Sequence, residues 1–118
     1  MFPEDELPEP IPNIYRTMEG VPVPRQDFLR LTRIPVVVYY GDNIPDNPSD
    51  VPAQDFWRAS LTMARRWAEA INSYGGDATV VHLPDEGITG NTHFLFADLN
   101  NEEVADHLSR WLRRQRLR

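Results

Sequence analysis

One short segment constrains the fold of this chain more than any other. Residues 34–40 read Ile-Pro-Val-Val-Val-Tyr-Tyr, so the segment is apolar throughout instead of alternating between polar and apolar positions. β-branched and aromatic residues of this kind favour extended backbone. An uninterrupted apolar strand is typical of a parallel sheet that helices cover on both faces. We therefore predict a buried strand of an α/β fold at residues 34–40.

A long helix and a second strand are expected next. Apolar residues recur at helical spacing over residues 53–74, which predicts an amphipathic helix. Pro52 suits the start of this helix and the glycines at 75 and 76 suit its end. Residues 78–83 read as a second strand. The predicted apolar face of the helix comprises Phe56, Trp57, Ser60, Ala64, Trp67, Ala68 and Ile71.

The last predicted element is a helix that starts near Asn100 or Asn101. Its apolar face would carry Val104, Leu108, Trp111 and Leu112. The order strand, helix, strand, helix implies two parallel strands joined by a right-handed crossover. Two strands cannot bury an apolar segment on both faces, so we expect a larger sheet. The remaining strands would come from sequence outside this chain, from a complementary chain or from a homo-oligomer.

The first 33 residues are expected to be irregular. Prolines are frequent there, and each one fixes φ and removes a backbone donor. A short helical turn is predicted only near residues 26–31. We therefore divide the chain into an irregular Pro-rich segment, residues 1–33, and an α/β part, residues 34–118.

Composition and charge exclude several classes of function. The formal net charge of −6 argues against nucleic-acid binding, which requires a basic surface. The sequence contains no cysteine, so thiolate chemistry is impossible. No stretch is long and apolar enough for a membrane span, and no signal peptide is visible, so a cytoplasmic location is the default expectation. The arginines of the last nine residues are interpreted as a solvated helix end.

We expect the reactive side chains to lie where the two predicted strands end. Sites in open α/β sheets gather at the carboxyl ends of the strands, where the loops at residues 41–46 and 87–94 would meet. The second loop carries His93, and the first carries Asp42 and Asp46. A histidine oriented by a carboxylate can act as a general base toward a hydroxyl nucleophile.

Two separated motifs carry a resemblance to a known family. Residues 87–94 read Gly-Ile-Thr-Gly-Asn-Thr-His-Phe, residues 98–101 read Asp-Leu-Asn-Asn, and residues 104–106 read Val-Ala-Asp. With residues 34–45 upstream, they resemble the C-terminal part of α/β-hydrolases of the esterase and lipase group, over roughly residues 20–115. The resemblance implies a C-terminal β-α-β-α portion of an α/β-hydrolase sheet. It implies that His93 is the triad histidine, that the substrate is a small-molecule ester, and that no cofactor is used.

The sequence departs from that family at the nucleophile. The family places its serine in a G-x-S-x-G turn between a strand and a helix, and this sequence contains no such motif. None of its serines directly follows a predicted strand; they are Ser49, Ser60, Ser73 and Ser109. Because the nucleophile precedes the acid and the histidine in the family, we expect it in sequence outside this chain.

The acid of the triad has three possible sources. Many α/β-hydrolases carry an aspartate three residues after the glycine that ends the penultimate strand, but that position here is Ile44. Asp42 and Asp46 are neighbours that could substitute for it. Alternatively, the acid follows an earlier strand outside this chain, as a glutamate does in some relatives.

Other interpretations stay open beside the hydrolase. Without the resemblance, His93 would be read as a loop histidine that bonds backbone, and His82 and His107 as structural or exposed residues. No ligand spacing predicts a metal site. A non-catalytic chain that folds with a partner, or serves as an interaction module, is the alternative function. A nucleotide-binding domain ranks last, because residues 41–43 lack a G-x-G-x-x-G turn.

Overall fold

The computed structural model describes residues 1–117, which form a mixed α/β fold. The chain divides into two compact units. The first comprises Met1–Val38 and Ile44–Val80, and the second comprises Tyr39–Asn43 and the chain from Val81 onward. The boundary passes through strands β5 (Pro35–Tyr40) and β6 (Asp77–His82). The ends of these two strands, where we predict the chemistry, therefore belong to the second unit.

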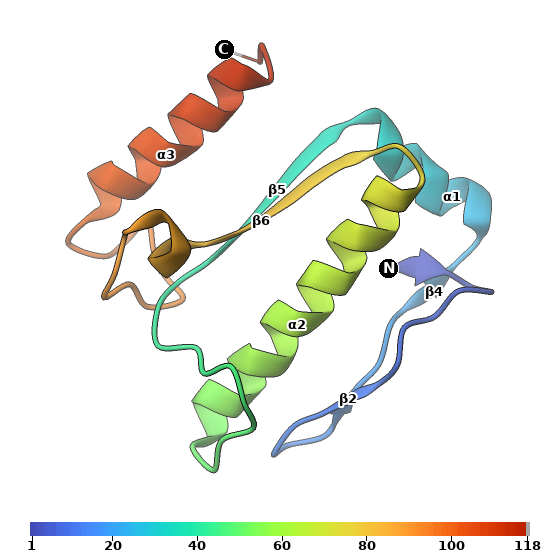
Figure 1. The fold of residues 1–118 in the computed structure, drawn as a ribbon, viewed down its shortest axis with the longest axis horizontal. Coiled ribbons are helices and arrows are strands. Elements are labelled where there is room, and N and C mark those ends of the chain that lie inside the picture. The colour runs from blue at the N-terminus through green and yellow to red at the C-terminus, as the bar shows by residue number, and fades with distance from the viewer. Residues whose placement is uncertain (118) are drawn as a thin grey trace. The chain divides into compact units, whose positions relative to one another are not determined.

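Strands β5 and β6 are neighbours in a two-stranded sheet. Helix α2 (Pro52–Ser73) connects them, and both strands run in the same direction (Figure 1). The predicted order of strand, helix and strand is thus confirmed. All six residues of β5 are only half-buried, which agrees with the expectation that two strands cannot bury this apolar segment. The larger sheet that would cover both faces of β5 stays a prediction.

Helix α2 begins and ends where the sequence indicates. Pro52 occupies its first turn, where a missing N–H costs nothing. It ends before Gly75, whose φ of 84° is in the left-handed region that favours glycine. The buried face differs from the prediction in its aromatic residues, because Phe56, Trp57 and Trp67 are only half-buried. The buried residues of the helix are Asp55, Ala59, Leu61, Ala68 and Ile71.

The core of the first unit lies where α2 meets α1 (Arg25–Arg30). Phe28 of α1 and Ile71 of α2 are both fully buried, and Ala68 and Ala78 complete the cluster. Full burial of a side chain such as Phe or Ile contributes about 1.5–3 kcal/mol. A short 3-10 helix, η1 (Leu31–Arg33), then leads into β5.

The N-terminal segment forms four strands of two residues each. β1 (Phe2–Pro3) pairs in parallel with β4 (Pro22–Val23), and β2 (Ile11–Pro12) pairs antiparallel with β3 (Thr17–Met18). The segment runs along α2 (Figure 1). Two arginines of α2 fix it there, because Arg58 donates to the carbonyl of Pro12 and Arg66 to that of Glu9.

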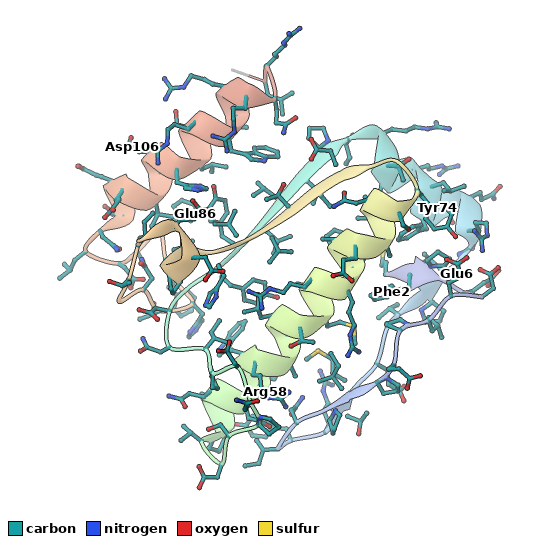
Figure 2. The ribbon with its side chains drawn as sticks, viewed as in Figure 1. Phe2, Glu6, Arg58, Tyr74, Glu86 and Asp106 are labelled. Atoms are coloured by element: carbon teal, nitrogen blue, oxygen red, sulfur yellow. The ribbon has the colours of Figure 1, made fainter. Side chains whose placement is uncertain are left out.

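A polar cluster joins the N-terminal segment to the end of α2. Arg25 donates to Asp5 at 2.7 Å and to Glu6 at 3.0 Å, and also to the Tyr74 hydroxyl. That hydroxyl donates in turn to Glu6, and the two residues face each other (Figure 2). Hydrogen bonds to Asp5, to Glu6 and to the Tyr74 hydroxyl raise the pKa of Arg25.

The second unit contains the 3-10 helix η2 (Leu83–Glu86), an irregular loop and helix α3 (Asn101–Arg114). Helix α3 starts as predicted, with Asn100 as its N-cap residue. Its buried residues are Val104, His107 and Trp111. The loop before it contributes Ile88, Asn91 and Leu95 to the interior of the unit. Within residues 1–117, no helix has the length and apolarity needed to cross a membrane.

Candidate active site

His93 lies on the irregular loop between η2 and α3, and its side chain is exposed. Its imidazole lies against the ring of Phe94, with ring centroids 4.2 Å apart and planes inclined by 42°. Phe94 is itself 67 % exposed, and Phe96 is 49 % exposed. The predicted base is therefore a solvent-accessible histidine that lies against the exposed ring of Phe94. An accessible imidazole can exchange protons with a bound reactant, as a general base must.

The end of β5 contacts the histidine loop directly. The amide of Asp42 donates to the carbonyl of Asn91 at 2.9 Å. The amide of Gly90 donates to Oδ2 of Asp42 at 2.7 Å, and the amide of Asn43 donates to Oδ1 at 2.6 Å. The sequence-based expectation that the two loops meet is confirmed by these bonds. They hold the loop at a point only two residues before His93.

The amides of Gly90 and Asn43 also lower the pKa of Asp42. Hydrogen bonds from Gly90 and then from Asn43 hold the pKa of Asp42 below its usual range, and burial opposes them less strongly. A carboxylate that accepts backbone N–H groups is stabilised in its ionised form. Asp42 is therefore an anion near neutral pH, which suits either an anchor for the loop or the acid of a triad.

Asp46, the other predicted acid, lies in a different environment. It is an exposed residue of the loop between β5 and α2. This loop belongs to the first unit from Ile44 onward, whereas Asp42 and His93 both belong to the second unit. Within the second unit, the structure brings Asp42 to the loop that carries His93.

A buried asparagine organises the interior of the histidine loop. Asn91 is fully buried, and its Nδ2 donates to Oδ1 of Asn100 at 2.6 Å and to Asp98 at 3.3 Å. Nδ2 of Asn100 donates back to Oδ1 of Asn91 at 2.9 Å. Buried polar side chains must be hydrogen-bonded to avoid a desolvation cost, and this reciprocal amide pair satisfies Asn91. The pair joins the loop to Asn100, the N-cap residue of α3.

A second polar cluster in the same unit surrounds His107. Its Nδ1 lies 2.7 Å from the Tyr39 hydroxyl, and its Nε2 lies 3.6 Å from a carboxylate oxygen of Glu86. Glu86 projects from η2 in Figure 2. Burial raises the pKa of Tyr39, so its hydroxyl stays protonated at neutral pH. Sequence reasoning missed this cluster, although His107 lies three residues after Val104 and four before Trp111 on the apolar face of α3.

The remaining candidates are His82, a possible metal site and the four serines. His82, at the end of β6, has its Nδ1 3.7 Å from Asp85. Among residues 1–117, no group of three or more His, Asp or Glu side chains could hold a metal ion. Ser60 and Ser73 donate to carbonyls within α2, and the hydroxyl of Ser49 accepts from the amide of Val51. Ser109 lies within α3. All four serines thus lie in helices or in the loop before α2.

Comparison with known proteins gives an informative similarity among solved structures. No protein-family model matches the chain, and no curated protein matches it. Among solved structures, the chain is similar to that of a novel bacterial esterase, with 35% sequence identity and a TM-score of 0.62. The match covers 75% of this chain and 26% of the esterase chain, so this chain spans about a quarter of the length of that protein.

This similarity defines the class of fold. The chain has a mixed α/β fold that is esterase-like and corresponds to part of a longer esterase chain. An identity of 35% over 75% of the chain extends the likeness from the backbone to the sequence.

Proposed function

We propose that this chain is the C-terminal β-α-β-α part of an α/β-hydrolase and supplies the triad histidine of a serine esterase. The observation that carries the proposal is the position of His93. It lies on an exposed loop that hydrogen bonds tie to the end of β5, in a chain similar to a bacterial esterase. The carboxyl ends of parallel strands are where α/β folds place their reactive groups.

The proposed reaction is acyl transfer in two steps. A serine hydroxyl from sequence outside this chain attacks the ester carbonyl while His93 accepts the hydroxyl proton. The imidazolium then donates that proton to the leaving alcohol as the acyl-enzyme forms. In the second step His93 takes a proton from water, the hydroxide attacks the acyl group, and the serine recovers its proton. The carboxylic acid leaves and the imidazole is neutral again.

We further propose that the triad acid also comes from outside this chain. Both oxygens of Asp42 already accept backbone amides, from Asn43 and from Gly90. These bonds support a role for Asp42 as the anchor of the histidine loop. The role that the resemblance leaves open for Asp42, and for Asp46, is tested by substituting each of them separately.

The test is ester hydrolysis by the full-length protein with and without His93→Ala. Short-chain p-nitrophenyl esters are suitable substrates, because they report acyl transfer directly. Glu102→Gln, on the exposed first turn of α3, is the matched control and should retain wild-type activity. Wild-type kcat/KM in His93→Ala would end the claim that His93 is the base.

A second candidate function follows from the exposure of β5. Each of its six residues is half-buried, although the segment is apolar and typical of a fully covered strand. In this alternative, the chain is non-catalytic and folds with a complementary chain or a second copy that covers the strand. Light scattering coupled to size exclusion distinguishes the two. A monomer that unfolds cooperatively would argue against an obligatory partner.

A further inference from the structure

The backbone on both sides of His93 is held by Asp98 and Thr92. Oδ2 of Asp98 accepts the amide of Thr92 at 2.8 Å, and Oδ1 accepts the hydroxyl of the same residue at 2.9 Å. The Thr92 hydroxyl oxygen accepts in turn the amide of Phe94 at 3.1 Å. The residue before His93 and the residue after it are therefore both tied to one carboxylate, the second through the threonine hydroxyl.

We infer that Asp98 is a positioning residue for His93, acting through Thr92. The inference rests on the proposed function, because it gives His93 a reason to be held. Asp98 does not need to touch the reactant. It fixes the backbone from which the imidazole projects, and the direction of the imidazole decides whether its nitrogen reaches the serine hydroxyl.

The geometry favours this role over a general contribution to the loop. Two oxygens of one carboxylate bind two donors of one residue, so the contact fixes both the position and the orientation of Thr92. Hydrogen bonds to an ionised acceptor are about twice as strong as neutral ones. The fixed residue is the immediate neighbour of the proposed base. A shift of roughly 1 Å in a reacting group can reduce a rate by about 100-fold.

Asp98 also has contacts that are merely structural. Its Oδ2 accepts from the buried Asn91 at 3.3 Å, and its backbone carbonyl accepts the amide of Asn101 at the start of α3. Loss of Asp98 could therefore weaken the fold without any effect on chemistry. The test must separate these two consequences, and the threonine provides the means. Thr92→Val keeps the shape of the side chain but removes the hydroxyl, whereas Thr92→Ser keeps the hydroxyl.

The experiment measures kcat and KM for ester hydrolysis by the full-length protein in four variants: Asp98→Asn, Thr92→Val, Thr92→Ser and His93→Ala. We expect Asp98→Asn and Thr92→Val to lower kcat by roughly 10- to 100-fold with KM changed less than about 3-fold. Thr92→Ser should remain within about 3-fold of wild type. Native-state hydrogen exchange should show faster exchange of the Phe94 amide in Thr92→Val but not in Thr92→Ser.

Each outcome has a definite consequence. If His93→Ala is inactive while Thr92→Val keeps wild-type kcat, the positioning role is overturned and the proposed function stands. Equal loss of kcat in Thr92→Val and Thr92→Ser would also overturn it, because the hydroxyl would not be the cause. If Asp98→Asn fails to fold, the two threonine variants decide alone. Full activity in His93→Ala would instead reject the proposed function, whatever hydrogen exchange shows for the loop.

Discussion

Gly41 lies in direct contact with the backbone of Thr92, so closely that a Cβ on Gly41 would overlap the Thr92 carbonyl oxygen. The same Cβ would lie 2.9 Å from the carbonyl oxygen of Asn91. Gly41 is the residue that directly follows β5, and it is buried. The absence of a side chain at this position thus allows the end of β5 to reach the loop that carries His93.

Gly41→Ala is therefore expected to displace the histidine loop. The overlapping atoms are backbone atoms, which cannot rotate away, so we expect a loss of about 1–3 kcal/mol in the free energy of unfolding. Urea unfolding measures this loss, and ester hydrolysis should fall with it. Gly90→Ala is the control in the same loop. Its φ of 82° makes alanine strained, but no atom lies within 4 Å of the added Cβ. A smaller loss of unfolding free energy in Gly41→Ala than in Gly90→Ala would contradict the close contact between Gly41 and the backbone of Thr92.

Asp42→Asn separates an anchor from a triad acid. An asparagine has a single acceptor oxygen, so it cannot replace both bonds that the carboxylate makes to Asn43 and Gly90. If Asp42 is only an anchor, Asp42→Asn should lower kcat by less than about 100-fold. Replacement of the acid in a triad costs about 10⁴-fold, because the histidine takes the wrong tautomer. Steady-state kinetics of the variant decide between the two, and a loss near 10⁴-fold would identify Asp42 as the acid.

Asp55 should make the first unit sensitive to acid. The side chain is 5 % exposed and accepts from the amides of Ser49 and Ile14 and from Nε of Arg58. Arg58 above all, and then the Ser49 amide, hold the pKa of Asp55 below its usual value. A lowered folded-state pKa stabilises the protein fully above the unfolded-state pKa, about 4. That stability is lost as the pH falls through the lower folded-state value.

The variant Asp55→Asn tests this account. We expect it to lose about 1–3 kcal/mol of unfolding free energy at pH 7, because asparagine has one acceptor oxygen in place of two and leaves a part-buried donor without a partner. Below about pH 4 the difference from wild type should shrink, because the unfolded state then binds a proton at Asp55 before the folded state does, and it should be lost as the pH falls through the folded-state pKa. Urea unfolding at a series of pH values measures both effects. A difference that is independent of pH would show that the ionised form has no special role.

Tyr39 and His107 should depend on each other. In Tyr39→Phe, the buried Nδ1 of His107 loses a partner at 2.7 Å, so we expect a cost of about 1–3 kcal/mol. Removing both polar groups should cost less than the sum of the single losses, because no unpaired group remains. A double-mutant cycle with His107→Leu measures this coupling. Strict additivity of the two substitutions would rule out the contact.

The regular elements of this chain could be predicted from its sequence. The periodicity of residues 53–74 and the glycines at 75 and 76 correctly indicated α2, and the apolar run at 34–40 indicated β5. Such signals are local, since each depends on residues within a few positions of one another. The full burial of β5 stays a prediction, because it depends on further strands that the segment itself does not specify.

The polar contacts of the site could not be predicted. Asp98 lies six residues from Thr92, and Asp42 lies 48 residues from Gly90. No periodicity pairs these residues, and each aspartate reads as an ordinary turn residue on its own. The buried Asp55 was likewise missed, because a charged residue near the start of a helix is more often a solvated one. Only the folded loops show which amide each carboxylate accepts.

The role of His93 is tested most directly by chemical rescue. In the full-length protein, His93→Ala should lower kcat for ester hydrolysis by at least about 10³-fold. Added imidazole should restore part of that activity, because it can occupy the vacated space and accept the serine proton. Imidazole should have no such effect on Gly41→Ala, which retains the histidine. Wild-type kcat in His93→Ala without imidazole would contradict the proposal that His93 is the base.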